Sequence, residues 1–119
     1  MTSLSAINAS RFNGLRDQAL AALKKVNTQA RAASREGRTE DEANLVSARS
    51  ALRQTLQDID QAEDAFIRSS MTVAEAEAQL KNAGEQARAA VAAMADVAAM
   101  LQRAADLVAL LGRLTVLFG

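Results

Sequence analysis

Four carboxylates form the densest group of chemically capable side chains in this sequence: Asp58, Asp60, Glu63 and Asp64. Asp60 would share a helix face with Glu63 or Asp64, so a carboxylate metal site is one interpretation. Helical bundles that hold two metal ions use Glu-x-x-His pairs, however, and this chain has no histidine. A calcium loop needs backbone carbonyls and a glycine turn that a helix does not offer. We therefore expect no metal site and interpret the cluster as a solvated helix face.

Nucleophilic and redox chemistry also lack their usual residues. Cysteine is absent as well as histidine, which removes thiolate nucleophiles, disulfides and the common neutral-pH base. The serines have no histidine to activate them, and no glycine-rich phosphate loop is present in the sequence. We expect neither catalytic residues nor a cofactor, and we predict that the protein is not an enzyme.

A basic run could follow the phosphates of a nucleic acid: Lys24, Lys25, Arg31, Arg35 and Arg38. No aromatic residues alternate with these cations, as they do in many single-strand binding surfaces. The 14 basic and 14 acidic residues of the chain also cancel, and a neutral chain is not a general polyanion binder. We expect no nucleic-acid partner.

These side chains must be positioned by helices, because the composition favours helices throughout. The 119 residues include no proline, five glycines and three phenylalanines, and Ala, Leu, Gln, Glu, Arg and Lys dominate. Apolar positions at steps of three and four predict helices over residues 3–36, 40–70 and 73–118, with a possible kink near 82–84. The length predicts a single domain, residues 1–119. The predicted fold class is all-α: a long antiparallel helical hairpin plus a longer C-terminal helix, in a three-helix coiled-coil-like bundle.

Local signals mark the turns between these helices. Gly37 is expected to end the first helix in the left-handed conformation. Thr39 and Glu42 are spaced as a capping box for the second helix, and Thr72 and Glu75 repeat the pattern for the third. The sequence therefore predicts two tight connections.

Charge indicates that the first two helices are antiparallel neighbours. Basic residues outnumber acidic ones six to two in the first helix, and acidic residues outnumber basic ones seven to three in the second. A tight turn would place Arg16 near Asp60 and Arg11 near Asp64. Each exposed pair contributes only about 0–1 kcal/mol, so the pattern selects the pairing more than it stabilises it.

The last third of the chain is more apolar than a two-helix hairpin can cover. A straight third helix would draw level with the first turn near residue 103, so that Ala104 onward, roughly 24 Å of helix, would overhang the hairpin. A solvated helix cannot be apolar on nearly all sides. The alternative is a break at Gly84 or Gly112 that folds the helix back and closes a four-helix monomer.

An overhanging apolar helix needs a partner, and three kinds would satisfy it. Copies of the chain could bury their Ala/Leu-rich helices together, or the helix could dock on another helical protein, as in an adaptor or chaperone-like module. A small membrane-active protein of the pore-forming type is not favoured, because the segment from Leu107 to Phe118 spans about 18 Å of a hydrocarbon core of roughly 30 Å. We expect a non-enzymatic structural or assembly subunit that forms a homo-oligomer. The expected interface is Val97, Met100, Leu101, Leu107, Val108, Leu110, Leu111, Leu114, Leu117 and Phe118.

The start of the chain bears on localisation. It reads Met-Thr-Ser-Leu-Ser-Ala and lacks the basic-then-apolar run of a signal peptide. The sequence also has no run of 18 uncharged apolar residues. We expect a cytoplasmic protein, or one exported without a cleaved signal peptide.

Overall fold

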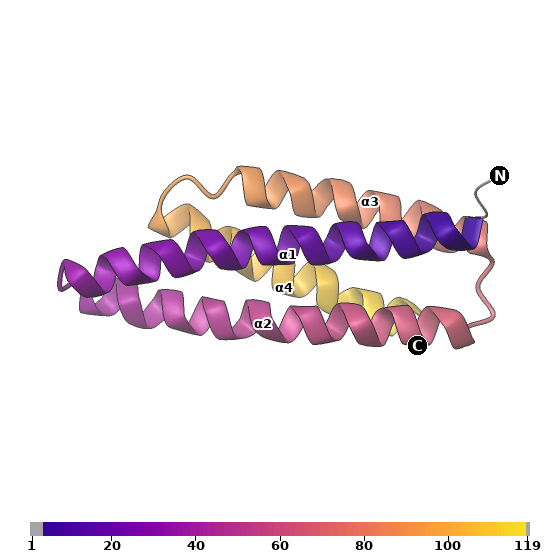
Figure 1. The fold of residues 1–119 in the computed structure, drawn as a ribbon, viewed down its shortest axis with the longest axis horizontal. Coiled ribbons are helices and arrows are strands. Elements are labelled where there is room, and N and C mark those ends of the chain that lie inside the picture. Colours follow the sequence, from indigo (N-terminus) through magenta and orange to yellow (C-terminus); the bar gives the residue numbers. More distant parts are fainter. Residues whose placement is uncertain (1–3, 119) are drawn as a thin grey trace.

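Four helices, counted over the described residues, build the fold in this computed structural model (Figure 1). The backbone is described for residues 4–118 and the side chains for residues 8–118, so the predicted first helical residue, Ser3, lies outside the described part. The all-α class is confirmed, and the three-helix arrangement is wrong. The helices are α1 (Leu4–Arg35), α2 (Thr39–Arg68), α3 (Val73–Ala92) and α4 (Val97–Phe118).

The first hairpin, α1–α2, is antiparallel as predicted. Arg16 Nε donates to Asp60 Oδ1 at 2.9 Å near one end of the pair. Arg49 Nη1 donates to Asn27 Oδ1 at 3.0 Å nearer the turn. As the residue number rises along α1, that of its partner on α2 falls, which is the register of an antiparallel hairpin.

The second hairpin, α3–α4, packs on the first so that α1 and α3 run parallel, as do α2 and α4 (Figure 1). Arg11 pairs with Glu77 at 3.1 Å, and Lys25 Nζ donates to the carbonyl of Val91 at 2.9 Å, with 66 residues between the partners in both contacts. Because α3 ends close to Lys25, the last ten residues of α1, about 15 Å of helix, extend beyond it. We call the projecting part, residues 27–46, the hairpin tip.

The core runs along the bundle axis and draws on all four helices. Alanines such as Ala19, Ala22, Ala62 and Ala87 are fully buried, which lets the helices approach closely. Leu45, Leu52 and Ile59 of α2, each seven residues from the next, are buried in this core. The largest fully buried apolar side chains are Phe12, Leu15, Val26, Leu45, Leu52, Ile59, Leu80, Leu107 and Leu111.

The helix expected over 73–118 is interrupted at residues 93–96, which is the main correction to the sequence prediction. α3 passes through 82–84 without a kink sharp enough to end it, and Gly84 and Gly112 both lie inside helices. Asp96 begins α4, because its Oδ1 accepts from the backbone N–H of Ala99 at 2.8 Å. The overhang predicted from Ala104 onward is therefore wrong: α4 folds back and packs beside α2.

The turn at Gly37 has the predicted left-handed conformation, with φ of +71°. The backbone N–H of Arg38 donates to the carbonyl of Ala33 at 2.9 Å, and that of Gly37 to the carbonyl of Ser34 at 3.3 Å. This pair of bonds is the Schellman arrangement, which satisfies carbonyls at the end of α1.

The two predicted capping boxes have different outcomes. At the start of α3, Thr72 Oγ1 accepts from the N–H of Glu75 at 3.2 Å, and the carboxylate of Glu75 accepts from the N–H of Thr72 at 3.1 Å, so this box is confirmed. The box at Thr39 is wrong, because Arg38 occupies the N-cap and Thr39 is already the first helical residue. The short Schellman turn starts α2 one residue earlier than predicted.

Candidate interface on the C-terminal helix

Half of the predicted interface is buried inside the single chain. Met100, Leu107, Leu111, Leu114 and Phe118 are each 5% exposed or less. They lie on the face of α4 that closes the bundle core. The need for a partner that the sequence indicated for these five residues is therefore met by the chain's own helices.

The three phenylalanines of the chain fix the end of α4. The ring of Phe118 lies 5.9 Å from Phe12 of α1 and 5.8 Å from Phe66 of α2, measured between centroids. The Phe12 and Phe66 rings are 6.0 Å apart. Such tilted and edge-to-face pairs add to the area that the rings bury, so α4 is held at its last helical residue.

The other half of the predicted interface remains partly open. Val97, Leu101, Val108 and Leu110 are half-buried, and Leu117 is 38% exposed. The most exposed large apolar residue in the described part of the chain, Val116 at 81%, was not among the ten. Its position could have been found from the helical period, once the buried stripe is known to face the chain's own core.

We call one side of α4 its outer face. Its residues recur at steps of three and four, are half-buried or exposed, and carry no charge over roughly 30 Å of helix. Several are small, which would allow the backbone of another helix to come close. The outer face comprises Ala98, Leu101, Ala105, Val108, Ala109, Gly112 and Val116.

A hollow of about 410 Å³ lies in the groove between α4 and α2 beside this face. Its lining carries no charged side chain in the described structure. The hollow widens the uncharged surface beyond α4 itself. It is lined by Ser47, Ala48, Ala51, Leu101, Ala104, Ala105, Val108 and Ala109.

The opposite side of α4 faces α3 across a looser and more polar seam. Two adjoining hollows, of about 580 and 330 Å³, share Gln86, Leu110 and Arg113 in their linings. Charge appears on this flank of α4, where Arg103 Nη1 lies 3.2 Å from Asp106 Oδ2. The exposed surface of α4 thus has an uncharged side toward α2 and a charged flank toward α3.

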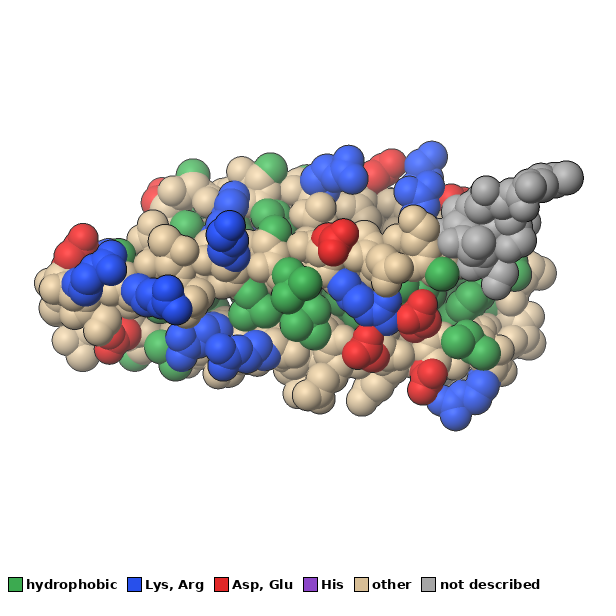
Figure 2. All heavy atoms as spheres, in the orientation of Figure 1, with side chains coloured by type: hydrophobic (Ala, Val, Ile, Leu, Met, Phe, Trp, Pro, Cys, Tyr) green, Lys and Arg blue, Asp and Glu red, His purple; other side chains and the backbone are tan. Residues whose placement is uncertain are grey.

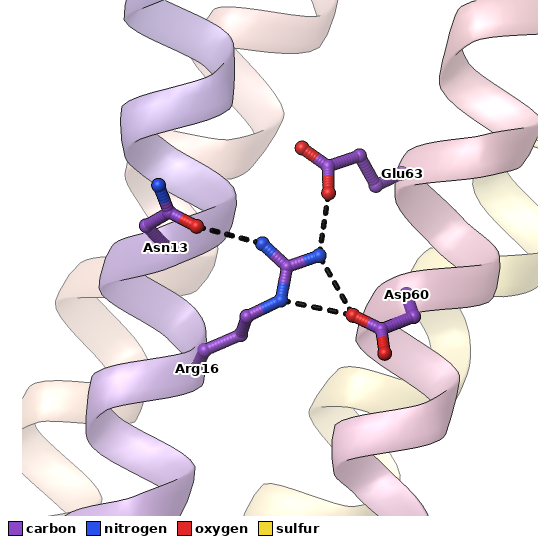
Figure 3. A network of polar contacts seen from close by, with 4 residues as sticks. All are labelled: Asn13, Arg16, Asp60 and Glu63. Carbon is purple, nitrogen blue, oxygen red and sulfur yellow. Dashed lines mark hydrogen bonds and ion pairs between the residues drawn. The ribbon is translucent and has the colours of Figure 1, made fainter.

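Two carboxylates of the acidic cluster considered as a metal site, Asp60 and Glu63, instead join α2 to α1 (Figure 3). Arg16 reaches Asp60, Glu63 and Asn13 together. Burial lowers the pKa of Arg16, but hydrogen bonds to Glu63 and Asp60 outweigh it, so the pKa is raised above its ordinary value. The Arg16–Asp60 contact predicted from charge is confirmed. In the described residues, no group of three or more acidic side chains is placed to hold a metal ion.

Contacts between α1 and α3 were not found from the sequence. Arg11 pairs with Glu77 of α3 rather than with Asp64, so that predicted pair is wrong. Buried Asn8 donates from Nδ2 to the carbonyl of Val73 at 3.0 Å. Both contacts depend on the parallel packing of helices about 65 residues apart in sequence, which local patterns do not encode.

The basic run lies along the second half of α1 and around the turn. Figure 2 shows lysine and arginine side chains over the half of the molecule that carries the hairpin tip, and others over the rest of the same view. Some of these cations have partners within the chain: Lys25 binds the carbonyl of Val91, and Arg38 pairs with Glu36 and Asp41. The expectation that no nucleic acid binds here stays a prediction.

The chain matches no protein-family model, no curated protein and no solved structure. No helix within the described residues is long and apolar enough to cross a membrane. The candidate site therefore rests on the chain's own chemistry: an uncharged face of α4, the hollow beside it, and the charged flank behind it.

Proposed function

We propose that the protein is a non-enzymatic structural or assembly subunit that self-associates through the outer face of α4. The observation that carries this proposal is the uncharged, solvent-accessible outer face of α4. The last residue of this face, Val116, is 81% exposed. Apolar surface of this extent on one helix favours contact with another protein surface. The proposal keeps the predicted role of α4 but moves the contact from its buried face to its outer face.

Native mass and sedimentation of the full chain over a range of concentrations test the proposal. The informative variant is Ala105→Asp, which puts a charge in the middle of the outer face at an exposed position. Its matched control is Ala78→Asp, at an exposed alanine inside α3. Both changes cost similar helix propensity. We expect only the first to lower the average mass; a full chain that is monomeric at several hundred micromolar contradicts the proposal.

A second candidate is an adaptor that docks its α3–α4 hairpin on another helical protein. The seam between α3 and α4 favours it, because two adjoining hollows follow this seam from Gln79 to Ala93. A helix laid into such a groove would contact Leu110 and Leu117. This function predicts a monomer in isolation, so the same mass measurement separates it from self-association.

A further inference from the structure

The charged flank of α4 indicates how two copies would meet. Asp106 and Arg113 are seven residues apart, so they lie on the same side of the helix, two turns from one another. Both line the hollow on the α3 side. Within the described residues Asp106 pairs with Arg103, whereas Arg113 makes no ion pair. Arg113 is an exposed cation beside an uncharged face, with an anion two turns before it.

In two antiparallel helices related by a two-fold axis, a residue of one copy lies opposite the residue of the other copy that is equally far from the axis on the other side in sequence. With the axis at Ala109, Asp106 of each copy lies opposite Gly112 of the other copy. Arg113 follows Gly112 and is about 1.5 Å further along that helix, so it lies nearly opposite Asp106. The axis also keeps the charged flanks of both copies, which face α3, on the same side of the interface between the two α4 helices. Two symmetric Asp106–Arg113 pairs then form between the copies, one on each side of the two-fold axis.

The same axis suits the uncharged face. Ala109 meets its own counterpart, and the small residues Ala105 and Gly112 lie about one turn from it. The midpoint of the outer face, from Ala98 to Val116, is residue 107, two residues or about 3 Å of helix from Ala109. Charge and shape therefore select nearly the same centre. A parallel pair, with its two-fold axis along the helices, would instead put the two α3-side flanks on opposite sides of the interface, where Asp106 of one copy does not face Arg113 of the other.

Resting on the proposed function, we propose that the partner of α4 is a second copy of this chain, packed through the outer faces in an antiparallel dimer with its two-fold axis at Ala109. Contact through a single helix of each copy buries less accessible surface than the roughly 800 Å² per partner of a stable interface. The dimer is therefore weak, and its tests use high protein concentrations or covalent capture.

Disulfide capture tests the direction of packing, because the chain has no cysteine. Ala109→Cys places a thiol at the axis, and we expect rapid oxidation to a covalent dimer. Ala98→Cys places a thiol at another exposed position of the same face. In the antiparallel dimer the thiols that this change introduces in the two copies are about 33 Å apart, too far to form a disulfide. Cross-linking of both variants to the same extent, or of neither, refutes the antiparallel seam.

Charge reversal in trans tests the pairing. Asp106→Arg and Arg113→Asp should each weaken dimerisation at least about tenfold, because each variant alone sets like charges opposite one another. An equimolar mixture of the two variants restores both opposite-charge pairs, so we expect a heterodimer of native strength. Thermal melting of each variant checks that the fold is retained.

These outcomes separate the two proposals. If the native chain self-associates but the mixture does not recover, the antiparallel pairing is refuted while self-association stands. If the native chain is monomeric at several hundred micromolar, both fail, and the outer face belongs to a different partner.

Discussion

The Phe118→Ala change tests the return of α4 to the core most directly. Truncating a buried phenylalanine costs about 3–5 kcal/mol. Phe118 is 4% exposed and contacts two other rings, but it is the last helical residue, so its surroundings can partly close the space. We expect the lower end of the range, a loss of about 3 kcal/mol, which lowers the melting temperature of a chain this size by about 12 °C.

The matched control is Val116→Ala, two residues earlier and 81% exposed. It should change the free energy of unfolding by less than about 0.5 kcal/mol and act on self-association instead. Urea unfolding followed by circular dichroism measures both variants. Equal, small effects of the two changes would show that the end of α4 is not docked on α1 and α2, as in the straight helix first expected from the sequence.

Three further predictions concern helix ends, glycines and the ion pairs of Arg16. Gly84→Ala should raise stability by about 0.5–1 kcal/mol, since in the described structure an added Cβ meets no atom within 4 Å, whereas Gly37→Ala should lower it because φ is +71° there. Thr72→Ala should cost about 1 kcal/mol through loss of its capping bond, and Thr39→Ala should cost much less. Arg16→Ala should cost about 1 kcal/mol, with a smaller difference at high salt. Chemical unfolding at two salt concentrations measures all five variants.

Each of these predictions has an outcome that contradicts it. Equal costs at the two threonines would mean that the helix starts are assigned wrongly. A destabilising Gly84→Ala would mean that another surface closes on α3 at that position. A salt-independent effect at Arg16 would show that packing of its alkyl chain outweighs its ion pairs.

Local patterns in the sequence predicted much of the fold. Apolar residues at steps of three and four predicted the first two helices, and residues at this spacing, such as Phe12 and Leu15, form a buried face. The Gly37 turn and the Thr72 cap were also correct, because each depends on residues close together in sequence. The Arg16–Asp60 pair followed once a tight turn fixed the register.

The break at residues 93–96 could not be predicted in the same way. Alanine and methionine are strong helix formers, so local propensity favours continuation. The burial of α4 overrides that preference, and Asp96 is the one local signal for the new start. The interface prediction failed in part for a related reason: spacing identified Leu107 and Leu111 as residues to be buried, but not which helices bury them.

The hairpin tip divides α1 between two environments. Near Phe12 the helix is enclosed by the other helices, whereas near Ala33 it has α2 beside it and small side chains at the contact. Amide protons in the tip should therefore exchange with solvent through local opening, while those near Phe12 exchange only when the whole bundle unfolds. One continuous helix would thus belong to two cooperative units, with the tip able to open and close while the phenylalanine end stays intact.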